Sequence, residues 1–152
     1  MTRAEKAKEY FGQGYACSQA VALAFADLTA MSEEDVAKAT LPFGGGLGRL
    51  RLTCGAVSGM AFAYGLICGL GENTAENKMK TYEITRLLCE RFAKENGSLI
   101  CADLLEGKNL FVEKGGAPEE RTAQYYQKRP CPEIVYSAAK ILEEYLQEVG
   151  KL

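Results

Sequence analysis

Cysteines are the residues of this 152-residue chain whose type best suits chemistry, and there are six of them. The chain contains no histidine, which excludes Ser/His/Asp and Cys/His nucleophile pairs, histidine-ligated zinc and an imidazole proton shuttle. A chain of this length does not need disulfides to fold, so the thiols are expected to be metal ligands, redox groups or buried apolar side chains. The six are Cys17, Cys54, Cys68, Cys89, Cys101 and Cys131.

Four of the cysteines are expected at the starts of helices. Helix N-termini present unpaired backbone N–H groups and about half a positive charge, and both favour a thiolate over a thiol. Thr53 is the expected N-cap of the helix after it, and Cys131 is the expected cap of its own helix because Pro132 suits the first helical position. No Cys-x-x-Cys pair is present, so tertiary folding has to assemble any cluster of thiols. The four at helix starts are Cys17, Cys54, Cys101 and Cys131.

Cys54 has the strongest case as a reactive thiol. From residue 36 to residue 71 there is no carboxylate, whereas Lys38, Arg49 and Arg51 supply three positive charges. These electropositive surroundings and the helix start predict a lowered pKa for Cys54 and a role as a catalytic nucleophile.

The other two cysteines are expected in the core. Cys68 follows Cys54 by fourteen residues in one predicted helix, about 21 Å away at about 1.5 Å per residue, which is too far for a shared metal or a disulfide. Cys89 lies on an apolar helix face with Leu88 and Phe92, where a free thiol behaves as a small hydrophobe.

A glycine-rich loop, residues 43–49, precedes the helix that Cys54 begins. It lacks the strand of a dinucleotide fingerprint and the Gly-Lys-Ser/Thr of a P-loop, so it is not predicted to bind nucleotides. Two interpretations stay open: the glycines turn sharply between helices, or they let the backbone approach a bound group beside Cys54. For the second interpretation, the candidate cofactor-binding residues are Gly44, Gly45, Gly46 and Arg49, with Arg51 as a further anion contact.

Apolar residues recur at helical spacing over almost the whole chain, which predicts an all-α single domain covering residues 1–152. The expected fold is a bundle of about six to seven helices in which the glycine-rich loop leads into a central buried helix. Residues 107–130 are expected as turns with one short helix after Pro118. The expected helices cover 2–11, 16–29, 33–41, 54–70, 74–95, 101–106 and 132–148.

The expected central helix, residues 54–70, is rich in glycine. Glycines four residues apart expose a smooth backbone strip, which predicts close approach by a neighbouring helix or by a cofactor. The glycines of this helix are Gly55, Gly59, Gly65 and Gly69.

Composition excludes several classes of partner. The formal net charge is −2, and no basic arm for nucleic acid is present. The longest apolar stretch, residues 56–70, is shorter than the ~18 residues of a membrane-spanning helix. The chain start has no apolar run after its positive residues, so a cytoplasmic protein with reduced thiols is expected. A homodimer is expected from the glycine-rich helix and from the tyrosines Tyr125, Tyr126, Tyr136 and Tyr145.

Four motifs follow one another along the chain: Tyr-Ala-Cys-Ser-Gln-Ala-Val around Cys17, the run from Phe43 through the glycine-rich loop to Gly59, Gly-Ser-Leu-Ile-Cys ending at Cys101 with Leu104 and Leu105, and Cys131 with Pro132. Together they resemble the redox-active protein family named for its cysteine pattern, C-GCAxxG-C-C. The resemblance covers most of the chain, roughly 15 to 145. In one departure, Thr53 stands where the family name has glycine before the second cysteine, and a glycine follows that cysteine instead.

The resemblance implies which cysteines are functional. It assigns Cys17, Cys54, Cys101 and Cys131, the same four that are expected at helix starts. A similar domain accompanies haem in split-Soret cytochromes, where it resembles an iron–sulfur-binding module. No Cys-x-x-Cys-His attachment motif is present in this chain, so no haem is expected.

Three functional hypotheses stay open. In the first, the four thiolates converge as metal ligands, hold a [2Fe–2S] cluster and exchange electrons with a partner or a small redox substrate. In the second, the protein is an enzyme of thiol–disulfide or peroxide chemistry in which Cys54 attacks and one of the other three thiols resolves. In the third, it is a helical binding module whose thiols are inert or hold structural zinc.

Overall fold

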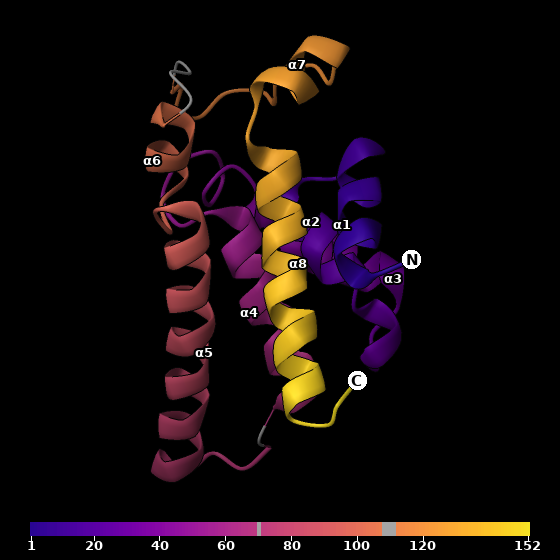
Figure 1. The fold of residues 1–152 in the computed structure, drawn as a ribbon, viewed down its shortest axis with the longest axis vertical. Helices are drawn as coiled ribbons and strands as arrows, with labels where there is room; N and C mark the ends of the chain where they lie inside the picture. Colours follow the sequence, from indigo (N-terminus) through magenta and orange to yellow (C-terminus); the bar gives the residue numbers. More distant parts are fainter. Residues whose placement is uncertain (70, 108–111) are drawn as a thin grey trace.

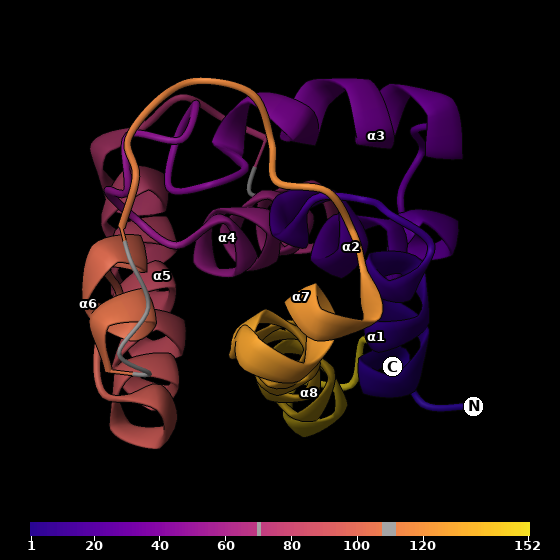
Figure 2. The same cartoon turned by 90° about the horizontal axis from the view of Figure 1, so that it is seen from above.

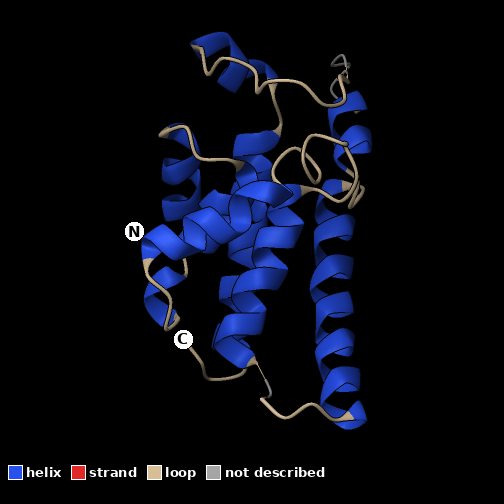
Figure 3. Ribbon diagram, turned by 180° about the vertical axis from the view of Figure 1, so that it is seen from behind, coloured by secondary structure: helices blue, strands red, loops and turns tan. Residues whose placement is uncertain are grey.

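The computed structural model describes residues 1–69, 71–107 and 112–152 of the chain. The described residues form helices and loops, with one isolated bridge between Thr53 and Ile100 (Figure 3). The predicted all-α fold is confirmed, with eight α-helices in the described ranges instead of six to seven. These are α1 (Arg3–Gly12), α2 (Cys17–Leu23), α3 (Glu33–Thr40), α4 (Gly55–Cys68), α5 (Ala75–Asn96), α6 (Cys101–Glu106), α7 (Ala123–Lys128) and α8 (Cys131–Glu148), with 3-10 helices η1 (Ala26–Leu28) and η2 (Leu41–Phe43).

Helix α8 lies at the centre of the core because its apolar residues recur three and four positions apart. Val135, Ala138 and Leu142 on this stripe are all 0% exposed. Helices α1, α2, α4 and α5 contact α8, and Figure 1 shows α5 and α4 running beside it. The buried side chains of Leu88 and Phe92 fix α5 to the same core, as their spacing predicts.

Helices α2 and α4 are in close contact because two glycines of α4 leave room for α2. A Cβ atom on Gly59 would lie 2.5 Å from the carbonyl oxygen of Ser18, so no larger residue fits without a shift of backbone. Gly65 faces open space, and Gly69 follows the end of α4. Close helix packing therefore explains the glycines Gly55 and Gly59 in the buried N-terminal half of α4, and it does not explain the other two.

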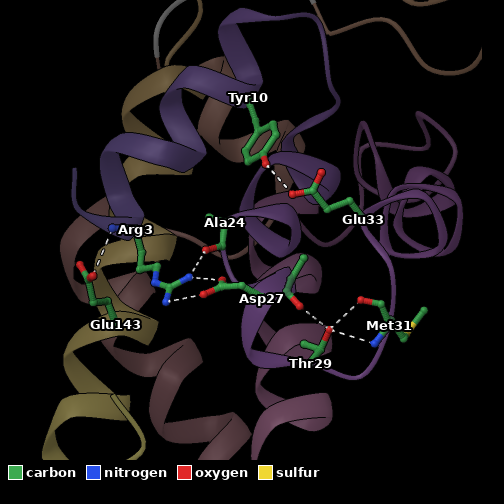
Figure 4. Close-up of polar contacts among 9 residues, drawn as sticks. Arg3, Tyr10, Ala24, Asp27, Thr29, Met31, Glu33 and Glu143 are labelled. Carbon is green, nitrogen blue, oxygen red and sulfur yellow. Dashed lines mark hydrogen bonds and ion pairs between the residues drawn. The ribbon is translucent and has the colours of Figure 1, made fainter.

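Helix α2 ends earlier than its apolar pattern predicts. Instead of one helix over 16–29, α2 ends at Leu23 and the 3-10 turn η1 follows. The guanidinium of Arg3 stabilises this interruption, since it donates a hydrogen bond of 2.9 Å to the carbonyl oxygen of Ala24 and pairs with the carboxylate of Asp27 (Figure 4). The end of α2 is thereby fastened to α1.

Replacing Asp27 by asparagine is expected to lower the free energy of unfolding at neutral pH by about 0.5–1 kcal/mol, the contribution of a partly exposed ion pair. The hydrogen bond from Arg3 holds the pKa of Asp27 below its ordinary value. The stabilisation is therefore present above the unfolded pKa of about 3.9 and is lost as the pH falls through the folded pKa. Urea unfolding at about pH 7 and about pH 2 measures the difference, which should vanish in acid. An equal difference at both pH values would contradict this role.

Three of the four tyrosines on which the homodimer expectation rests pack against aromatic rings of their own chain. The rings of Tyr125 and Tyr126 lie 6.3 and 5.8 Å from that of Phe11, and the ring of Tyr145 lies 6.0 Å from that of Tyr64. These three side chains therefore give no support for a homodimer, which stays a prediction. None of the described helices combines the length and the apolar character that crossing a membrane requires.

Candidate functional site

One pocket of about 420 Å³ is lined by all four of the cysteines at helix starts, Cys17, Cys54, Cys101 and Cys131. They come from four separate parts of the chain, which tertiary folding brings to one pocket. Cys68 and Cys89 do not line it and pack against the core instead, as predicted. Apolar side chains complete much of the lining, among them those of Phe11, Leu104, Leu105 and Ile134.

Each of the four thiols lies at a helix start. Cys17, Cys101 and Cys131 are the first residues of α2, α6 and α8. Cys54 is the N-cap of α4. Backbone N–H groups that have no partner within their own helix are therefore close to the pocket.

Two expected caps are wrong. Thr53 does not cap α4, because its backbone pairs with Ile100 in the isolated bridge and leaves the cap position to Cys54. Cys131 does not cap α8: Pro130 is the N-cap, and the proline that follows Cys131 takes the second helical position. Both shifts move a cysteine by one position and keep it at the helix start.

Two short backbone hydrogen bonds join the segments of Cys54 and Cys101. The N–H of Cys54 donates to the carbonyl oxygen of Leu99 at 2.7 Å, and the N–H of Cys101 donates to that of Leu52 at 2.6 Å. These bonds flank the bridge before α4 and α6, so the starts of the two helices are held side by side. The two thiols are thus neighbours through backbone pairing, which spacing along the sequence could not indicate.

The starts of α2 and α4 meet at Gly55. A Cβ atom there would lie 2.5 Å from the Sγ of Cys17 and 2.9 Å from the carbonyl oxygen of Phe43. A larger residue after Cys54 would therefore collide with this thiol and with the backbone, and glycine lets the two helix starts lie close together.

The glycine-rich loop, residues 43–49, folds back on itself beside the pocket. Gly45 and Gly46 have φ angles of 66° and 75°, the left-handed region that glycine adopts readily. A Cβ atom on Gly46 would lie 2.8 Å from the Cβ of Cys101. The loop therefore turns sharply and also approaches a pocket cysteine, and Gly44, Gly45 and Arg49 line the pocket. Cofactor binding by this loop stays a prediction.

Positive charge predominates on the pocket wall. Among the described lining residues the carboxylate of Glu119 is accompanied by four arginines. Arg121 lies 4.3 Å from the ring centroid of Phe11 and donates hydrogen bonds to the carbonyl oxygens of Phe11 and Tyr15, both at 3.1 Å. The excess of cations favours an anionic occupant. The four are Arg49, Arg51, Arg121 and Arg129.

A segment that we call the strap, residues 112–122, covers one side of the pocket. Figure 2 shows it arching from the α6 side of the molecule to α7. Arg49 fastens it through a hydrogen bond from its guanidinium to the carbonyl oxygen of Ala117 and through its own carbonyl, which accepts from the N–H of Gly115 at 2.9 Å. Arg51 adds a bond of 2.8 Å from Nε to the carbonyl oxygen of Glu113. The two arginines of the glycine-rich region thus hold the strap over the thiols.

Among the pocket residues that were not predicted as site residues are Arg121, Tyr125 and Arg129. Residues 107–130 are expected as turns with one short helix after Pro118, and α7 is that helix, but nothing local shows which side of the fold the segment faces. A pair of adjacent tyrosines between two arginines is nevertheless a signal for cation–π contacts, and the guanidinium carbons of Arg121 and Arg129 do lie 4.9 and 5.2 Å from the ring centroid of Tyr125.

Burial raises the pKa of three pocket thiols. The pKa of Cys54 lies well above its ordinary value, because burial penalises the charged form more than the N–H of Ala56 stabilises it. Burial also raises the pKa of Cys131 to about 12 and raises that of Cys17. For Cys54 the direction is opposite to the lowered pKa that its helix start and basic surroundings predict. A role for Cys54 as a low-pKa nucleophile in the metal-free protein is therefore not supported.

At about pH 7.5, Cys54 and Cys131 should react with iodoacetamide at least about tenfold more slowly in the folded protein than in urea, because only the thiolate attacks. The rates are followed for each cysteine by mass spectrometry of tryptic peptides. Cys68, outside the pocket, serves as the internal comparison. Fast labelling of folded Cys54 would contradict this expectation and restore the nucleophile hypothesis.

The pocket thiols do not meet at one point. Over residues 1–69, 71–107 and 112–152, no group of three or more cysteine or carboxylate side chains is placed to hold a single metal ion. A single zinc ion needs its ligands about 2.3 Å from one centre. The described structure thus places the four thiols in one pocket without a metal site among them.

Comparison with known proteins identifies a family. No curated protein and no solved structure matches the chain. Residues 15–145 match the family described as "Putative redox-active protein (C_GCAxxG_C_C)". The matched span contains the four pocket cysteines, the glycine-rich loop and the strap. The match confirms the resemblance seen in the sequence motifs, and the chain belongs to the C_GCAxxG_C_C family.

Proposed function

We propose that the protein is an electron carrier whose four pocket cysteines hold a [2Fe–2S] cluster. The observation that carries the proposal is the shared lining of one pocket by Cys17, Cys54, Cys101 and Cys131, which come from four different helix starts. A [2Fe–2S] cluster takes four cysteine ligands, two on each iron. The redox character of the family agrees with this use of the thiols.

The chemistry of the donors supports a cluster over a single ion. Every candidate ligand is a thiol, and the chain has no histidine to compete for the metal. Zinc is not redox-active whereas an iron–sulfur cluster carries electrons, so the redox character of the family favours the cluster over structural zinc.

The residues around the thiols would stabilise the bound state in two ways. The arginines of the wall offset the negative charge that four thiolates bring, and the apolar lining of Phe11 and Ile134 excludes water. A bound [2Fe–2S] group supplies one-electron transfer. The raised pKa values of Cys54 and Cys131 mean that these thiols release protons when they become ligands, so assembly should be favoured as the pH rises.

Thiol–disulfide or peroxide chemistry with Cys54 attacking has weaker support. That thiol is buried and its pKa is raised, whereas an attacking cysteine needs an accessible, ionised sulfur. An electron-transfer partner, a homodimer and a cytoplasmic location are predictions that accompany the proposal.

Anaerobic reconstitution with ferrous iron and sulfide tests the proposed function. A brown protein with visible sulfur-to-iron charge-transfer bands, and about two iron and two sulfide per chain, is the expected result. Colourless protein that takes up one zinc per chain would favour the structural-zinc hypothesis. Colourless protein that takes up neither metal would overturn both metal hypotheses.

A further inference from the structure

Arg51 is a buried cation, only 7% exposed, in a pocket that the thiols share. None of the ion pairs found in the described part of the chain includes it. Its Nη1 donates a hydrogen bond to the Sγ of Cys101 at 3.7 Å, and its Nε donates to the carbonyl oxygen of Glu113 at 2.8 Å. A buried guanidinium without a carboxylate is costly, so an anionic sulfur at Cys101 would stabilise it.

The backbone also holds Arg51 against Cys101. The N–H of Ala102 donates to the carbonyl oxygen of Arg51 at 3.2 Å, beside the bond from Cys101 to Leu52. Arg51 itself has a φ angle of 62°, a left-handed conformation that a non-glycine residue adopts at a cost. Side chain and backbone together therefore direct this guanidinium at one of the four thiols.

We infer that Arg51 is a positioning residue for the sulfur of Cys101: it holds this sulfur in place by a charge-assisted hydrogen bond. The hydrogen bond itself does not depend on the proposed function. Its effect on a reduction potential does, because it requires the bound cluster. Hydrogen bonds and positive charge at a ligand sulfur stabilise the reduced state of a cluster, so Arg51 would raise its reduction potential.

Arg49 is the matched control for this inference. It has the same φ angle of 62°, lines the same pocket and fastens the same strap through Ala117. Its hydrogen bonds among the described residues go to the strap and the loop and none to a sulfur. Arg51→Met and Arg49→Met thus remove equal charge at equal backbone strain, and only the first removes the contact to Cys101.

The first test uses the metal-free protein. Iodoacetate is anionic and iodoacetamide is neutral, so the ratio of their rates at Cys101 reports the local charge independently of how much thiolate is present. Arg51→Met should lower this ratio about three- to tenfold, the effect of one unit charge a few ångströms away, and Arg49→Met should lower it less than about twofold. Arg51→Lys should restore most of the ratio. Arg51→Gln, which removes the charge but keeps a polar side chain, replaces Arg51→Met should that variant fail to fold.

The second test uses the reconstituted protein. Its midpoint potential should shift to more negative values in Arg51→Met, and by a clearly smaller amount in Arg49→Met, which removes a pocket charge but no contact to a ligand sulfur. Equal ratios in the two variants of the metal-free protein, or equal potentials in the two loaded variants, would overturn the inference. Failure of the wild type to take up a cluster would overturn the proposed function, and the alkylation ratio would still decide whether Arg51 acts on Cys101.

Discussion

Replacing Cys54 by serine should abolish cluster assembly. Cys54 is the most enclosed of the four pocket thiols and caps α4, and the glycine that follows it packs against the thiol of Cys17. Loss of a direct ligand should cost more than the ten- to 100-fold that outer contacts typically contribute, so we expect at least about a 100-fold lower occupancy under equal reconstitution conditions. Visible absorbance and iron content per chain measure it. Serine at Cys17, Cys101 or Cys131 should have a comparable effect.

Alanine at Cys68 and Cys89 is the matched control for the serine variants. Both thiols are partly buried and pack against the core, and neither lines the pocket. The double variant should therefore lose about 1–2 kcal/mol of stability and keep full iron content. A folded Cys68→Ala/Cys89→Ala protein without a cluster would show that the functional set of thiols has been assigned wrongly.

The second large effect is expected at Gly59, where an alanine should reduce stability by at least about 1–3 kcal/mol. Its Cβ would lie 2.5 Å from the carbonyl oxygen of Ser18, so α2 and α4 would have to move apart. Because Cys17 begins α2 and Cys54 caps α4, the same movement should also weaken cluster assembly. Thermal and urea unfolding of the metal-free protein measure the stability, and iron content after reconstitution measures the assembly.

Gly65 in the same helix provides the control for Gly59. No atom lies within 4 Å of a Cβ built there, so alanine should raise stability by about 0.5–1 kcal/mol through its better helix propensity. Equal effects of Gly59→Ala and Gly65→Ala would mean that the contact between α2 and α4 does not depend on glycine.

The fold was predictable where one apolar stripe determines one helix. The stripe of Val135, Ala138 and Leu142 places α8 in the core, and the positions of Leu88 and Phe92 do the same for α5. The prediction is wrong where a residue far away in the sequence determines the end of a helix. The apolar run over 16–29 does not indicate that Arg3 pairs with Asp27 and that the helix is interrupted there.

The four cysteines of the candidate site could be predicted from the sequence, but only some of the residues around them could. Helix-start chemistry and the family motifs select the same four cysteines that line the pocket. The strap contacts and Arg121 could not be predicted, because they depend on how residues 112–122 cross the fold. The prediction of a lowered pKa for Cys54 is wrong for a physical reason. The N–H groups of the helix start lower the pKa, but the burial of the thiol raises it by more.

Residue-resolved alkylation before and after anaerobic reconstitution tests most directly whether four thiols act as one ligand set. The folded protein is labelled anaerobically, for long enough that every cysteine of the metal-free protein reacts, and each cysteine is scored by mass spectrometry. The account predicts that Cys17, Cys54, Cys101 and Cys131 become protected together, in proportion to the iron bound, while Cys68 and Cys89 stay reactive. Protection of only some of the four, or of Cys68 or Cys89, would contradict it.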